Sequence, residues 1–270
     1  MPPLITFLSD FGLTDDFVGT CHGVIAGIAP DVRVIDITHG IRPGHVVQGA
    51  LVLANTLPYM PAGIHLAVVD PGVGGGRRAL ALRDGEGRLH VGPDNGLLLL
   101  AADRFGGVAA AHELANADYS LQPVSRTFHG RDLFAPAAAH LASGVDPAEL
   151  GPLLDPEELV RLELPEAAVG HNRIRAAALV LDRFGNIALN LRREQLDAID
   201  LGPGTRVELT CRGERFYAVF ARTFADAPRG ELILYEDSYG SLALAVSSGS
   251  AAQLLRAEEG TEIVLELGAP

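Results

Sequence analysis

Over the first 145 residues, short apolar runs alternate with longer stretches in which apolar residues recur at helical spacing. The short runs are rich in β-branched residues and predict buried strands at residues 4–9, 32–37 and 64–69. The longer stretches, with turn and capping residues at their ends, predict helices at residues 17–28, 45–57, 95–105 and 132–142. Alternating strands and helices indicate an α/β unit around a mostly parallel central sheet.

The pattern changes after this region. Residues 151–172 are rich in Pro and Glu and lose clean periodicity, which is typical of a linker. Short strands separated by turn signals are then predicted at residues 174–181, 187–191, 206–210, 215–220, 231–235, 241–246 and 262–267. They favour a small antiparallel barrel or sandwich. We therefore expect an α/β N-terminal domain at residues 1–165 and a smaller C-terminal β domain at residues 173–270.

The amino-acid composition excludes several classes of enzyme and binding site. The chain has 270 residues and a net charge of −13, and all 21 basic residues are Arg, because no Lys occurs. The absence of Lys excludes Schiff-base enzymes and the lysine-containing phosphate loop. The acidity argues against a nucleic-acid partner. Cys21 and Cys211 cannot form a four-thiolate zinc site.

The N-terminus, the apolar runs and the cysteines bear on where the protein is located. The N-terminus lacks a basic region followed by an apolar core, so we expect no signal peptide. No apolar run approaches the ~18 residues that span a bilayer, and we therefore expect no membrane association. The two cysteines suggest reduced thiols. The expected location is the cytoplasm.

Three polar clusters follow predicted elements of the α/β unit, where parallel sheets bind ligands. They begin at Ser9-Asp10, at Asp70 and at Thr127. The glycine-rich segment after Asp70 is a poor phosphate cradle, because it lacks Lys and opens with a carboxylate. A simple surface turn capped by Asp70 is the alternative interpretation.

The first cluster also allows more than one role. Asp10, Asp15 and Asp16 could supply oxygen ligands to a divalent metal, while Asp15 or Asp16 could instead cap the helix predicted from residue 17. A strand-end Asp such as Asp10 also suits the vicinal hydroxyls of a ribose. Among the nine histidines, only His129 lies in a loop flanked by small and charged residues.

The second half holds two polar segments between strands. These are Asp182-Arg183-Phe184-Gly185-Asn186 and Asp237-Ser238-Tyr239-Gly240. Taken alone, both predict hairpin turns.

Several motifs together resemble the S-adenosylmethionine hydroxide adenosyltransferases, which are hydrolases of S-adenosylmethionine related to fluorinases and chlorinases. The resemblance extends over nearly the whole chain. It rests on seven ordered motifs, at residues 9–16, 36–39, 69–74, 92–96, 127–132, 182–186 and 238–240.

The resemblance implies an α/β N-terminal domain, a C-terminal β-barrel and a homotrimer whose active sites are shared between subunits. It implies a catalytic set of Asp70, Arg77 and His129, with Arg78 as the competing arginine. It implies that Asp10 holds the ribose hydroxyls. The further substrate-binding residues that it implies are Asp15, Asp182, Ser238 and Tyr239 at the methionine end, Phe184, Asn186 and Phe224 at the adenine, and Phe128.

The expected activity is hydrolysis of S-adenosylmethionine to adenosine and L-methionine, by attack of activated water or hydroxide on C5′ of the ribose. S-adenosylmethionine is the small-molecule substrate, and neither cofactor nor metal is expected. The alternatives are a halide-using, chlorinase-like adenosyltransferase and a non-catalytic S-adenosylmethionine or nucleoside sensor. The halogenating relatives have Tyr at the positions of Asp70 and His129 and carry an extra loop in the N-terminal domain that this chain lacks. The fluorinase has Arg at the position of Tyr239.

Overall fold

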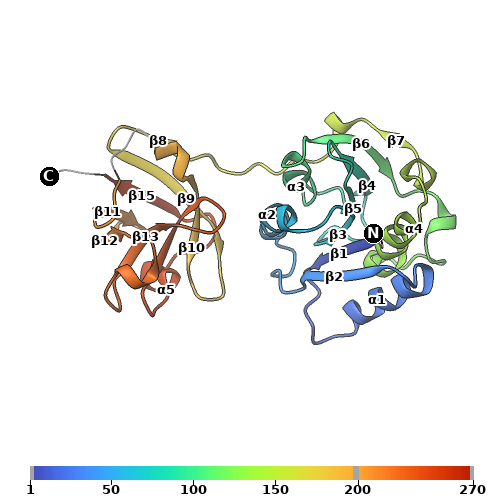
Figure 1. Ribbon diagram of the computed structural model, residues 1–270, viewed down its shortest axis with the longest axis horizontal. Helices are drawn as coiled ribbons and strands as arrows, with labels where there is room; N and C mark the ends of the chain where they lie inside the picture. The colour runs from blue at the N-terminus through green and yellow to red at the C-terminus, as the bar shows by residue number, and fades with distance from the viewer. Residues whose placement is uncertain (1–2, 197–200, 268–270) are drawn as a thin grey trace. The chain divides into compact units, whose positions relative to one another are not determined.

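The computed structural model describes residues 3–196 and 201–267, and the chain divides into two compact units, Met1–Leu162 and Glu163–Pro270. Figure 1 draws the first unit in blue to green and the second in yellow to red. Residues 1–2, 197–200 and 268–270, which the expected domain ranges include, lie outside the described residues. Within the described residues, no helix is both long enough and apolar enough to cross a membrane.

The first unit is a seven-stranded sheet in the order β2-β1-β3-β5-β4-β6-β7. Strands β2, β1, β3 and β5 pair in parallel, whereas β4, β6 and β7 pair antiparallel. The strands are β1 (Leu4–Ser9), β2 (Arg33–Thr38), β3 (Ile64–Val68), β4 (Ala79–Asp84), β5 (Leu89–Pro93), β6 (Val108–Glu113) and β7 (Leu153–Leu154). The expected α/β architecture is confirmed.

Helices cover both faces of this sheet. Successive side chains of a strand point to opposite faces, so neighbouring apolar residues pack into different cores. Phe7 packs in one core with helices α1 and α4, and its neighbour Leu8 packs in another with α2 and α3. The helices are α1 (Phe17–Ile28), α2 (Val46–Thr56), α3 (Leu99–Asp103) and α4 (Ala135–Ala142), the last preceded by a π-helix at Gly130–Phe134. Short 3-10 turns occur at Leu57–Tyr59, Ala117–Tyr119, Pro147–Leu150 and Pro156–Glu158.

The second unit is a closed barrel of seven strands in the order β10-β14-β13-β12-β11-β15-β9, closed by pairing of β10 with β9, and β8 extends it beside β9. The strands are β8 (Ala168–Val169), β9 (Arg173–Leu181), β10 (Ile187–Arg192), β11 (Arg206–Cys211), β12 (Glu214–Phe220), β13 (Leu232–Glu236), β14 (Ser241–Val246) and β15 (Glu262–Glu266). Helix α5 (Ala251–Leu255) and 3-10 turns at Arg193–Leu196 and Phe224–Asp226 complete it.

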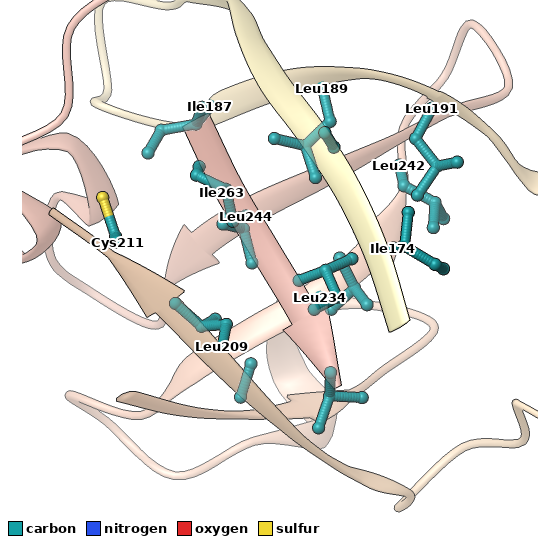
Figure 2. Packing of buried hydrophobic residues seen from close by; sticks show 14 of the residues in the cluster. Ile174, Ile187, Leu189, Leu191, Leu209, Cys211, Leu234, Leu242, Leu244 and Ile263 are labelled. Atoms are coloured by element: carbon teal, nitrogen blue, oxygen red, sulfur yellow. The ribbon is translucent and has the colours of Figure 1, made fainter. Parts of the chain in front are cut away.

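Aliphatic side chains from alternate strand positions fill the barrel, as Figure 2 shows for Ile187, Leu189 and Leu244. The expected barrel is confirmed, with one difference in strand direction. Strands β12 and β13 pair in parallel, because residues 221–231 carry the chain back before β13 begins. The barrel is therefore mixed rather than purely antiparallel.

Candidate functional site

The parallel strands deliver two carboxylates to one edge of the first unit's sheet. Asp10 follows β1 and Asp70 follows β3 by two residues, and the Asp10 amide donates to the Val68 carbonyl at 3.3 Å. β1 and β3 are neighbours in the sheet, so both side chains leave it at the carboxyl ends of adjacent strands. This is the edge at which α/β proteins bind ligands.

Asp70 is held by Arg77, which returns to it from the far end of the glycine-rich turn. Arg77 Nε donates to both Asp70 carboxylate oxygens at 3.0 Å, and Arg77 Nη2 also donates to Asp70 Oδ2. The two side chains are 12% and 5% exposed, so the pair is largely shielded from water. Gly74 permits the turn: its φ is +74°, and a Cβ there would lie 2.1 Å from the Arg126 carbonyl oxygen.

The same guanidinium contacts His129. Arg77 Nη2 lies 2.7 Å from His129 Nδ1. A guanidinium can only donate, so Nδ1 accepts and the neutral imidazole carries its proton on Nε2. Burial, and then the charge of Arg77, lower the pKa of His129 below its usual value. Arg77 therefore bridges a carboxylate and a neutral imidazole.

Arg78 has different partners. Its Nε donates to Asp94 Oδ2 at 2.8 Å, and its Nη2 donates to the Glu158 carbonyl at 2.6 Å. Of the two adjacent arginines, Arg77 is therefore the one that contacts Asp70 and His129.

Asp10 lies close enough to Asp70 for the charge of Asp70 to raise its pKa. Burial raises the pKa of Asp10, the Gly44 amide lowers it by donating to Oδ2 at 2.8 Å, and Asp70 raises it further. Two carboxyl groups and one guanidinium therefore meet here, and the remaining negative charge suits a cationic ligand.

An aromatic group adjoins the segment that carries His129. The Phe128 ring packs edge-on against Phe17 at 4.9 Å and against Phe11 at 5.8 Å. A Cβ on Gly130 would lie 2.7 Å from Phe11, so this close packing requires glycine. The pattern of the sequence did not single out Phe11 or Phe17; their position beside Ser9-Asp10 was the available signal.

Asp15 and Asp16, the acidic residues that follow Asp10, lie apart from the Asp70, Arg77 and His129 contacts. Asp15 and Asp16 are exposed, and Asp16 occupies the N-cap position of α1 without a side-chain capping bond. Within residues 3–196 and 201–267, Asp10, Asp15 and Asp16 do not form a group of ligand atoms spaced for a metal.

The second unit holds the remaining predicted residues in its loops. Asp182 Oδ1 accepts from the amides of Phe184 and Asn186 at 2.8 and 2.9 Å, and its Oδ2 accepts from Asn186 Nδ2 at 2.7 Å. These bonds all lie within the hairpin turn, as the sequence predicted. Phe184 is 67% exposed, which leaves its ring available to a partner.

A second polar turn follows β13. Asp237 Oδ1 accepts from the Tyr239 amide at 2.8 Å and the Ser241 amide at 3.0 Å, so Ser238 lies inside an Asx turn. Tyr239 is 45% exposed.

Tyr235 lies near the end of β13, within range of the charges of both polar turns. Burial raises its pKa to about 12, and the charges of Asp182 and Asp237 raise it as well. Its ring lies 5.1 Å from that of Phe224, which is itself 48% exposed. Sequence reasoning missed Tyr235, although an aromatic residue at a strand end beside a polar turn was the available signal.

Comparison with known proteins covers both units. Residues 5–151 match the SAM hydroxide adenosyltransferase N-terminal domain, and residues 176–264 match the corresponding C-terminal domain. An (R)-S-adenosyl-L-methionine hydrolase of Salinispora tropica is 48% identical over 266 residues, 98% of each chain. A fluorinase of Nocardia brasiliensis is 30% identical over 293 residues, covering 98% of this chain and 97% of the fluorinase. The crystal structure of an uncharacterized conserved protein from Thermotoga maritima superposes with a TM-score of 0.90 at 34% identity, covering 97% of this chain and 99% of that one.

Proposed function

The chain belongs to the SAM hydroxide adenosyltransferase family, and from that membership we propose that it is an enzyme that hydrolyses S-adenosylmethionine to adenosine and L-methionine. The observation that carries the proposal is the contact of Arg77 with both Asp70 and His129 at the carboxyl edge of the sheet. The higher identity to the hydrolase than to the fluorinase, 48% against 30%, favours water over halide as the nucleophile.

The reaction needs a nucleophile more than it needs help with the leaving group. Methionine leaves a sulfonium as a neutral thioether, whereas bulk water has a pKa of about 15.7 and supplies little hydroxide. Arg77 lowers the energy of a hydroxide formed beside it, because its positive charge stabilises the anion. The oxygen then attacks C5′ in line with the breaking carbon–sulfur bond.

The hydrogen bonds support one path for the water proton in this proposal. His129 Nδ1 accepts from Arg77, so the imidazole presents Nε2–H, a donor that orients the water oxygen. Asp70 keeps unused lone pairs on its carboxylate and accepts the water proton. The sulfonium loses its charge as the bond breaks, so a shielded site favours the transition state over the bound substrate.

The remaining residues bind the substrate in this proposal. Asp10 has one oxygen on Gly44 and directs the other to the ribose hydroxyls. The other substrate contacts are Asp15 with Asp182, Ser238 and Tyr239 at the methionine end, Phe184, Asn186 and Phe224 at the adenine, and Phe128. No cofactor takes part, and catalysis needs no metal. We propose a cytoplasmic location, which the free, buried cysteines Cys21 and Cys211 support.

Product analysis tests the activity. Purified protein incubated with S-adenosylmethionine should release equal amounts of adenosine and methionine, as measured by chromatography. The yield should be unchanged in excess chloride, and no halogenated nucleoside should form. Ligand binding without products would instead identify a sensor, and a chlorinated adenosine would identify a halogenase.

We also propose that the enzyme is a homotrimer whose active site takes Asp70 from one subunit and Asn186 from another. Asp70→Ala and Asn186→Ala proteins, each inactive alone, are unfolded together and refolded. Some interfaces then carry both intact residues, so part of the activity should return. If each chain completed its own site, every subunit would keep its lesion and mixing would restore nothing.

A further inference from the structure

In the part of the chain that the structure describes, one group of three side chains offers ligand atoms at a spacing that suits a metal ion. It consists of His22 on α1, Asp36 on β2 and His39 directly after β2, and none of them belongs to the site described above. We propose that these residues bind one divalent transition-metal ion, with zinc as the best match, and that the ion has a structural role rather than a catalytic one.

The distances suit the ion. Asp36 Oδ1 lies 2.9 Å from His22 Nε2 and 3.2 Å from His39 Nε2, and the three ligand atoms lie within 4.8 Å of one another. Ligands bound at 2.0–2.1 Å in a tetrahedral zinc site stand about 3.3 Å apart. A zinc ion therefore needs only small side-chain movements to enter the group.

His39 provides the independent observation. The residue is 4% exposed, and its Nε2 is buried without a well-formed hydrogen bond, although Asp36 Oδ1 is only 3.2 Å away. A buried polar atom that lacks such a partner carries a desolvation penalty. Coordination of an ion by Nε2 removes that penalty.

The other nitrogen of His39 is already arranged for metal binding. Nδ1 lies 2.7 Å from Ser9 Oγ, which also accepts from the Phe11 amide at 3.2 Å. With its proton on Nδ1, His39 donates to Ser9 and turns the lone pair of Nε2 toward the ion. Metal-binding histidines are commonly oriented by such a hydrogen bond from the second nitrogen.

The donor set and the exposure agree with zinc. A set of two imidazoles and one carboxylate suits zinc better than calcium or magnesium, because those two ions favour oxygen ligands. The side chains of His22 and Asp36 are 34% and 43% exposed, so an ion can reach them from solvent. Water would supply the fourth ligand, and the structural role rests on the place of the group outside the site of Asp70, Arg77 and His129 rather than on its number of protein ligands.

The location indicates what the ion does. It joins α1 to β2, and His39 also holds the segment that carries Asp10: its carbonyl accepts from the Gly12 amide at 2.7 Å. Ser9, the hydrogen-bond partner of His39, directly precedes Asp10. Bound zinc therefore stabilises the first unit and fixes the Asp10 segment without touching Asp70, Arg77 or His129.

The experiment measures zinc binding directly. Untagged protein is stripped with a chelator and titrated with zinc chloride by calorimetry near neutral pH, and its melting temperature is followed in parallel. We expect one zinc per chain in the wild type and a melting temperature raised by roughly 5 °C at zinc concentrations ~100 times the dissociation constant. His22→Gln and Asp36→Asn should each weaken binding at least about tenfold.

The control is His171→Gln, which removes an exposed histidine of the second unit and should leave zinc binding unchanged. Circular dichroism verifies that each variant is folded, and two separate ligand variants guard against the misfolding of one. Absence of saturable zinc binding by the stripped wild type would overturn the proposal. So would unchanged binding in both ligand variants. Products from S-adenosylmethionine are measured separately, so neither result depends on the hydrolase assignment.

Discussion

Replacing Arg77 with Lys tests the central contact of the proposed active site while keeping the positive charge at this position. The guanidinium donates through Nε to both oxygens of Asp70 and through Nη2 to Asp70 Oδ2 and His129 Nδ1. A lysine ammonium is a point charge on a flexible chain and cannot reproduce this planar fork. Arg77→Lys therefore retains attraction to Asp70 but loses the simultaneous contact with His129.

The magnitude follows from the bonds lost. Lysine loses the contact with His129 and the second arm of the fork on Asp70, which we count as about two charge-assisted hydrogen bonds of roughly 1.5–3 kcal/mol each. A loss of about 3–6 kcal/mol corresponds to a decrease in kcat of about 10²- to 10⁴-fold. Substrate affinity should change much less, because Arg77 acts on the nucleophile and not on the substrate in this mechanism.

Arg78→Lys is the matched control, because Arg78 is the adjacent residue and contacts Asp94 and Glu158 instead. Methionine release is measured at saturating substrate, and calorimetry gives the substrate dissociation constant of each variant. The reasoning is refuted if Arg77→Lys keeps kcat within about threefold of the wild type. It is also refuted if Arg78→Lys loses as much activity as Arg77→Lys.

Three further predictions follow. Once protonated, His129 can no longer accept the hydrogen bond from Arg77, so kcat/KM should fall as pH decreases, with an apparent pKa below 6.5. An acidic limb of the pH–rate profile centred above 6.5 would contradict this role. Burial lowers the pKa of His65 to about 3, so as pH falls below 6.5 the unfolded chain protonates this imidazole before the folded chain does. The free energy of unfolding should therefore decrease by roughly 5 kcal/mol between pH 6.5 and pH 3. Urea unfolding of the wild type should show this pH dependence, and His65→Gln should reduce it. Gly74→Ala should lower kcat at least about tenfold, because its Cβ would meet the Arg126 carbonyl and displace Arg77, whereas Gly76→Ala, with nothing within 4 Å, should not.

The sequence predicted the strands and helices with strong periodicity. The helix expected at residues 17–28 is α1, and the strand expected at 4–9 is β1. Strands β4, β5 and β6 were missed, because their alanines and the one glycine of β5 carry little intrinsic strand preference and pairing with neighbours determines their conformation.

One helix was predicted too long. The stretch at residues 95–105 forms a helix only at Leu99–Asp103, because Asn95 is engaged in a turn, where its side chain donates to the Val69 carbonyl at 2.8 Å. The choice between Arg77 and Arg78 also exceeded sequence reasoning. Adjacent arginines are equivalent in a pattern, and only the path of the glycine-rich turn determines which one reaches Asp70.

The division of the chain into two units has a consequence for how this family diversifies. Asp70, Arg77 and His129 lie in the first unit, and the exposed rings of Phe184 and Phe224 lie in the second. In the proposed mechanism, substitutions in the first unit can therefore change the attacking group while the exposed rings of the second unit are retained. A relative named fluorinase remains 30% identical over nearly the full length of this chain.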